Sequence, residues 1–152
     1  MISNQKQSAR ALMVFSAVWA GLVIIFALSF FELFSSPLWM RLVLAGIIGL
    51  AALFFYVGGY NYIKIEVENN KNLVIKYYNL FPVGRKFKAF KIPLQNFHHH
   101  EIVYGLGGLT SNLLLFQRMQ GGVAKYPPVG LSAAGADGRK EISNFLSKLE
   151  KR

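Results

Sequence analysis

Two long apolar segments near the start of the chain constrain its fold more than any other feature. The first, Ala11–Phe31, contains no charged residue, and the second, Leu38–Gly59, contains only Arg41. A helix rises about 1.5 Å per residue, so about 20 apolar residues cross a hydrocarbon core about 30 Å thick. The connection between the two segments is too short for anything but a tight turn. The sequence therefore predicts a transmembrane hairpin of two antiparallel helices over residues 11–59.

A cleaved signal peptide is the alternative interpretation of the first segment, because Lys6 and Arg10 would suit the basic start of one. The apolar run is too long for a signal peptide, however, and no small-residue cleavage site follows it. Basic residues lie in the N-terminal tail, residues 1–10, and just after the second segment, whereas the hairpin turn has only Arg41 nearby. The positive-inside rule therefore predicts that both termini are cytoplasmic.

Small residues recur four apart within both apolar segments, at Ala17 and Gly21 and again at Ala45 and Gly49. This spacing lets helix backbones approach closely. We expect the two helices of the hairpin to pack on each other through these positions, and a binding face for another membrane protein is the alternative. Neither segment carries an acidic residue or a histidine in its interior, which argues against a proton relay or an ion pathway.

From residue 60 onward the apolar period changes to two, as in "YIKIEVE", which is typical of half-buried strands. A final amphipathic helix, residues 138–151 with Asp137 as its cap, places Ile142 and Leu146 on one face. The sequence thus predicts an α+β protein in which residues 60–152 form an antiparallel sheet or partly open barrel closed by this helix. The expected strands cover residues 62–68, 73–79, 85–92, 95–105, 112–119 and 123–126.

The segment "KIPLQNFHHHEIVYG", followed by a glycine-containing turn, a hydrophobic hairpin and the terminal "EISNFLSKL", resembles the bacterial pleckstrin-homology-like (PH-like) domains. Ile92, Pro93, Leu94 and Asn96 fit the strand end and the amide-bearing turn of that family. The resemblance implies a binding or scaffolding domain at the bacterial inner membrane, without catalytic residues. A more distant similarity is to the photosystem I assembly factors of thylakoids, which also join a helical hairpin to a cytoplasm-side domain.

Three consecutive histidines, His98, His99 and His100, precede Glu101 and suggest a metal site at first sight. Side chains of a strand alternate between its faces, so His98 and His100 would share one face, and His99 and Glu101 the other. If Phe97, His99 and Val103 face the interior, then His98 and His100 point outward. Zinc normally takes three or four protein ligands, so we predict no physiological metal site here.

The segment "GRKFKAFK" is the strongest candidate for a binding site, because its basic and aromatic residues alternate. After residue 58 the chain has 14 basic and 6 acidic residues, a formal charge of +8. A basic surface close to a cytoplasmic leaflet attracts anionic lipids, whereas lysines on an edge strand can also serve only to prevent aggregation. The residues expected to bind a lipid or a protein partner are Arg85, Lys86, Phe87, Lys88 and Lys91.

The remaining sequence motifs do not indicate a catalytic site. The chain has 152 residues and no cysteine, which excludes disulfides and cysteine nucleophiles. The glycines of "GLGGLTS" lie between strands rather than before a helix, so they do not form a nucleotide-binding loop. We therefore expect a non-enzymatic scaffold or accessory subunit that contacts the bilayer and other integral membrane subunits, without cofactor or nucleic acid. A module that binds anionic lipid headgroups is the alternative.

Overall fold

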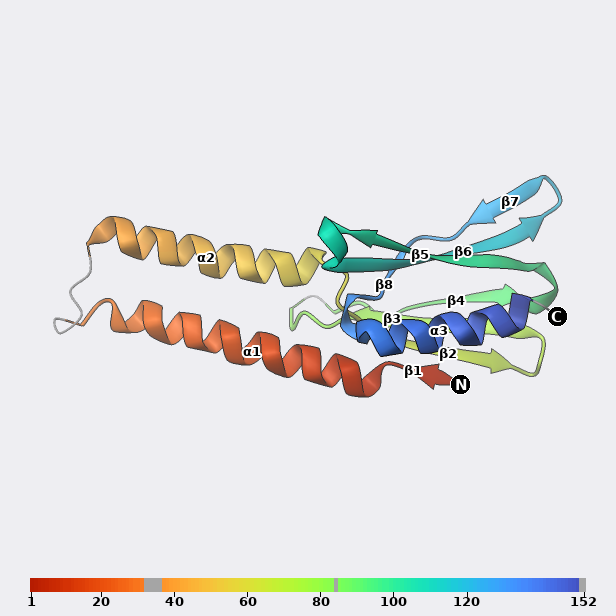
Figure 1. Ribbon diagram of the computed structural model, residues 1–152, viewed down its shortest axis with the longest axis horizontal. Coiled ribbons are helices and arrows are strands. Elements are labelled where there is room, and N and C mark those ends of the chain that lie inside the picture. The colour runs from red at the N-terminus through yellow and green to blue at the C-terminus, as the bar shows by residue number, and fades with distance from the viewer. Residues whose placement is uncertain (32–36, 84, 151–152) are drawn as a thin grey trace.

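The computed structural model describes residues 1–31, 37–83 and 85–150, and it is an α+β structure (Figure 1). Two long apolar helices, α1 (Gln5–Leu28) and α2 (Leu38–Val57), extend side by side from one end of a sheet domain. Both are long and apolar enough to span a membrane. The expected hairpin turn, residues 32–37, lies almost wholly outside the described residues.

Residues 1–10, predicted to form an N-terminal tail, contain a strand and the start of the first helix. Ile2–Ser3 forms strand β1, which pairs antiparallel with β2 (Asn61–Glu68), and α1 begins directly afterwards at Gln5. Asn4 joins them, because its side chain accepts a hydrogen bond from the Ile63 N–H (2.8 Å) and donates one to the Asn61 carbonyl (2.9 Å). The start of α1 is therefore attached to the sheet.

Two antiparallel sheets build the domain. The first has the order β1-β2-β3-β4, with β3 at Asn72–Asn79 and β4 at Lys88–Pro93. The second joins β5 (Phe97–Gly105), β6 (Thr110–Met119) and β7 (Gly122–Lys125), and β8 (Val129–Gly130) pairs with β6. The expected third strand thus begins at Lys88 rather than at residue 85.

The C-terminal helix α3 (Gly135–Glu150) packs on the sheets and completes one core. Its start is earlier than expected, so Asp137 lies in its first turn and is not its cap. Alternating residues of both sheets point into this core, where each large aliphatic side chain contributes about 1.5–3 kcal/mol. The fully buried core residues include Ile63, Ile65, Ile75, Ile92, Leu113, Leu115, Ile142 and Leu146.

The small residues expected to join α1 and α2 do not do so. Ala17, Ala45 and Gly49 are exposed, and a Cβ added to Gly21 or Gly49 would meet no heavy atom within 4 Å among the described residues. The better-buried positions of α2 are instead larger residues at helical spacing, including Leu44, Ile48 and Phe55. The two helices meet instead through larger side chains, as the stacked rings of Phe15 and Phe55 show.

Candidate functional site

The end of the domain from which α1 and α2 emerge, here called the hairpin-facing end, is tightly joined to both helices. Phe15 of α1 stacks on Phe55 of α2 with ring centroids 3.9 Å apart, and Phe55 stacks on Tyr60 at 4.7 Å. Ser132 donates a hydrogen bond to the Gly58 carbonyl (2.5 Å) and accepts one from the Ser111 N–H (3.1 Å). These contacts fix the helices relative to the sheets.

Gly59 and Gly130 make the closest approach between the exit of α2 and the sheet. A Cβ on Gly130 would lie 2.4 Å from the Gly59 Cα, and Gly59 itself has a φ of +74°. Only glycine meets both demands without strain. The two glycines therefore allow β8 to pack directly against the backbone that follows α2.

The connection between β3 and β4 lies at the hairpin-facing end and contains most of the predicted basic site. We call residues 81–83 and 85–87, together with Lys88 at the first position of β4, the basic loop. Its first residue, Phe81, contacts Phe15 at 6.4 Å and Tyr56 at 5.4 Å between ring centroids. The loop thus lies beside both helices (Figure 1).

The predicted basic residues separate into three kinds. Arg85 donates hydrogen bonds to the carbonyls of Phe81 and Leu80, both at 3.3 Å, so it holds the loop in shape. Lys91 forms an ion pair with Glu68 at 2.6 Å, farther along β4 and away from the helices. Lys86 and Lys88 are exposed on the loop. The structure therefore brings together only part of the predicted cluster.

A second loop reaches the hairpin-facing end from the other sheet. It joins β5 to β6 and includes the short helical turn η3 (Leu106–Gly108). Leu106 borders a hollow whose other lining residues include Leu50 and Leu53 of α2. Large apolar side chains are strongly exposed on the two loops: Val83 (72%), Phe87 (80%), Leu106 (68%) and Leu109 (66%).

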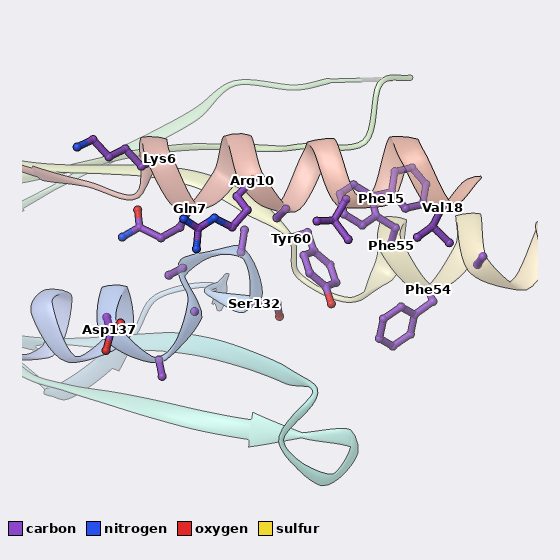
Figure 2. Close-up of a pocket in the computed structure, with 17 residues that line it drawn as sticks. Lys6, Gln7, Arg10, Phe15, Val18, Phe54, Phe55, Tyr60, Ser132 and Asp137 are labelled. Atoms are coloured by element: carbon purple, nitrogen blue, oxygen red, sulfur yellow. The ribbon is translucent and has the colours of Figure 1, made fainter. Parts of the chain in front are cut away.

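A cavity of about 800 Å³ opens between α1, the end of α2 and the start of α3 (Figure 2). One part of its lining is polar and includes Gln7, Arg10 and Asp137. The other part is apolar and lies between the two helices, with Val14, Phe15, Val18, Ala51, Phe54 and Phe55. Arg10 points from α1 toward the start of α3. The cavity is therefore amphipathic along its length.

This cavity does not follow from any local pattern in the sequence. Its polar residues come from segments far apart in the chain, and α1 was expected to begin only after Arg10. The signal that could have located it is the pair Gln7 and Arg10 in "QKQSAR", which is three apart and continues into the apolar run without a helix breaker. Such a pair lies on one face of a helix.

The histidine run follows a different pattern from the predicted alternation. A register shift between Phe97 and His99 leaves His98 as an extra, bulged residue. A bulge reverses the faces of the residues after it. His100 is consequently directed inward, with its side chain only 7% exposed, whereas Val103 is exposed. The prediction that His100 points outward is wrong for this reason.

His100 serves as a link between β5 and α3. Its Nδ1 lies 2.5 Å from a carboxylate oxygen of Glu150, and its Nε2 lies 3.0 Å from the Ser143 hydroxyl. His99 instead stacks on Phe116 at 4.2 Å. Among the residues that the structure describes, no group of three histidine, aspartate or glutamate side chains could hold a metal ion.

Charge pairing on the first sheet is strongest at Glu66. Its carboxylate lies 2.8 Å from the Lys64 ammonium and 2.6 Å from that of Lys76. Hydrogen bonds from Lys64 and then Lys76 lower the pKa of Glu66 to about 2. The same pairing, led by the hydrogen bond to Glu66, raises the pKa of Lys64. These ion pairs stabilise the pairing of β2 with β3. Lys64 and Lys76 therefore do not contribute to the basic surface at the hairpin-facing end.

No family model, curated protein or solved structure matches this chain. The function must therefore be inferred from the geometry of the hairpin-facing end itself.

Proposed function

We propose that the protein is a non-enzymatic, membrane-anchored module whose hairpin-facing end binds the headgroup layer of an anionic membrane. In this proposal α1 and α2 span the bilayer, and a PH-like domain lies against its cytoplasmic surface. The observation that carries the proposal is the position of the basic loop, which contacts both helices through Phe81. Its exposed lysines, Lys86 and Lys88, are then held at the level of the headgroups.

The exposed apolar side chains support the same orientation. Phe87 and Val83 are exposed on the basic loop, which contacts both helices through Phe81. Leu106 and Leu109 are exposed on the other loop, and Leu106 borders the hollow beside α2. Apolar side chains beside basic ones suit the membrane interface, where the apolar groups enter the boundary of the acyl chains and the basic groups attract anionic headgroups. Each lysine near an anionic surface contributes about 1 kcal/mol.

Tryptophan fluorescence of the full chain in lipid vesicles tests this proposal. Phe87→Trp is introduced into a Trp19→Phe/Trp39→Phe background, and the vesicles contain either brominated phosphatidylglycerol or brominated phosphatidylcholine. Brominated lipids quench a tryptophan that they contact. We expect stronger quenching by the anionic lipid, because Lys86 and Lys88 gather it around residue 87.

The double variant Lys86→Gln/Lys88→Gln should remove this preference, and so should salt at about 1 M, where the Debye length is about 3 Å. The matched control is Lys71→Gln/Lys125→Gln, which removes two exposed lysines away from the hairpin-facing end and should preserve the preference. Equal quenching by the two lipids at low salt would contradict the proposal.

A second candidate function is that of an accessory or assembly subunit for another integral membrane protein. The favouring observation is that a Cβ on Gly21, Gly46 or Gly49 would meet no heavy atom within 4 Å in the described chain. A partner helix could approach these backbones closely. The more distant alternative, an assembly role like that of the thylakoid photosystem I factors, rests on the same architecture.

Purification in mild detergent tests this second candidate. We expect Gly49→Leu to release a co-purifying membrane protein without changing the yield of folded chain, whereas Ile47→Leu, on the same helix, should retain it. Recovery of the same partner with both variants would count against the helix face as the binding surface.

A further inference from the structure

We propose that the amphipathic cavity of Figure 2 binds one phospholipid whose headgroup carries both a phosphate and a primary ammonium, as phosphatidylethanolamine does. The inference rests on the proposed membrane anchoring of α1 and α2. It concerns a single bound lipid at a different place from the basic loop, so the two can be tested separately.

The phosphate is assigned to Arg10. Its side chain extends from α1 toward the start of α3, whereas that of Lys6, which also lines the cavity, extends away from α3 in Figure 2. Within the described residues the Arg10 guanidinium has neither an ion pair nor a hydrogen bond, and it lines the cavity. A guanidinium binds a phosphate through two parallel hydrogen bonds. Gln7, beside it on α1, offers a further donor.

The ammonium is assigned to Asp137. This exposed carboxylate lines the same polar part of the cavity, on the α3 side, and forms no ion pair with Arg10. A purely anionic headgroup would meet repulsion from it. A headgroup with charges of both signs satisfies Arg10 and Asp137 together, and a primary ammonium offers three N–H donors that a quaternary ammonium lacks. The Ser132 hydroxyl already donates its proton to the Gly58 carbonyl, so it is not available as a donor to the headgroup.

The acyl chains are assigned to the apolar part between the helices. Val14 and Val18 of α1 face this space together with Ala51 and Phe54 of α2, and the stacked Phe15 and Phe55 form its wall. A volume of about 800 Å³ holds a headgroup and the first part of the chains, and it lies within the range of about 300–1,000 Å³ for small-molecule sites. The chains would continue along the exposed apolar surface of the hairpin into the bilayer.

Native mass spectrometry of the full chain in a neutral detergent tests the assignment. Dioleoyl phosphatidylethanolamine, phosphatidylglycerol and phosphatidylcholine are added separately at equal concentrations. We expect one phosphatidylethanolamine to be retained in preference to the other two. Arg10→Gln should weaken its retention by roughly ten- to hundredfold, since a hydrogen-bonded charge pair is lost. Asp137→Asn should lower the retention of phosphatidylethanolamine and raise that of phosphatidylglycerol.

Matched variants distinguish loss of lipid binding at the cavity from a general loss of folding or lipid binding. Val14→Trp fills the apolar part and should abolish retention, whereas Met13→Trp, an exposed neighbour outside the cavity, should not. Arg118→Gln removes a distant guanidinium and should also leave retention unchanged. Circular dichroism verifies that each variant is folded. Preferential retention of phosphatidylglycerol by the unaltered chain, or equal retention by Val14→Trp and Met13→Trp, would overturn the inference.

The basic-loop variant Lys86→Gln/Lys88→Gln distinguishes this inference from the proposed function. It should abolish the preference for anionic lipid around residue 87 and still retain one phosphatidylethanolamine. Loss of the retained lipid in this variant, with retention in Val14→Trp, would assign the lipid to the loop and overturn the cavity site. Absence of the anionic preference in the unaltered chain, with retention at the cavity intact, would instead contradict only the proposed function.

Discussion

At the scale of single residues, His100 shows how a side chain that suggests metal binding can serve packing. It is nearly buried and contacts both Glu150 and Ser143 on α3. The backbone N–H of His100 also donates to the Glu150 carboxylate, at 2.7 Å. The histidine therefore joins the second sheet to the helix that closes the core.

We predict that His100→Ala lowers the free energy of unfolding by about 1–3 kcal/mol, because a partly buried carboxylate loses its side-chain partner. His98→Ala, at the bulged neighbour, should change it by no more than about 0.5 kcal/mol. Chemical unfolding of the two variants in detergent measures the difference. Equal losses would mean that His100 does not link β5 to α3.

Asn4 illustrates a residue role that no local sequence pattern indicates. Its amide continues the β1–β2 pairing, and it is nearly fully buried although it precedes an apolar helix. We predict that Asn4→Ala costs about 1–3 kcal/mol, since the buried Ile63 N–H loses its acceptor. Gln5→Ala, at the exposed next position, is the control. An unchanged thermal midpoint for Asn4→Ala would show that β1 does not need this bond.

At the scale of elements, the regular patterns were informative and the irregular ones were not. Alternation in "YIKIEVE" and the apolar face of the last helix correctly indicated β2 and α3. The two-residue strand Ile2–Ser3 is too short to have a period, and the bulge at His98 is invisible because the residues around it still look alternating. Small-residue spacing at Gly21 and Gly49 suggested helix packing, but the helices meet through Phe15 and Phe55.

The junction between α2 and the sheet depends on two glycines. We predict that Gly130→Ala is strongly destabilising, because its Cβ would overlap the Gly59 backbone, whose atoms cannot move aside without displacing α2. Gly121→Ala is the matched control, since a Cβ there meets nothing within 4 Å among the described residues. The yield of folded protein and its thermal midpoint report the effect. Similar midpoints would contradict close packing at this junction.

The β2–β3 ladder should depend on pH through Glu66. The folded-state pKa is about 2, below the ordinary value of 4.5, so this stabilisation is complete above pH 4.5 and is lost as the pH falls toward 2. Unfolding at a series of pH values should show this loss. Glu66→Gln should reduce the pH dependence in that window, whereas Glu141→Gln, an exposed residue of α3, should not. An identical acid profile for both variants would show that Glu66 does not contribute.

At the scale of the whole molecule, the candidate site is the hairpin-facing end, and only part of it follows from the sequence. The basic residues of "GRKFKAFK" were identified, but their division among Arg85, Lys91 and the exposed lysines depends on contacts with Leu80, Phe81 and Glu68. The cavity was missed because it needs α1, α2 and α3 in place together. The division of the basic residues and the cavity both depend on contacts between residues far apart in the chain, which no local periodicity encodes.

The central claim is that the two loops beside the hairpin lie at the bilayer surface. Single cysteines can carry spin labels directly, because the chain has none of its own. Labels at Val83, Leu106 and Gln120 of the full chain in vesicles are compared for their accessibility to oxygen and to a water-soluble nickel complex. We predict that Val83→Cys and Leu106→Cys favour oxygen, as at an interface, while Gln120→Cys, in the turn between β6 and β7, favours nickel. Equal preference for nickel at all three positions would contradict the account.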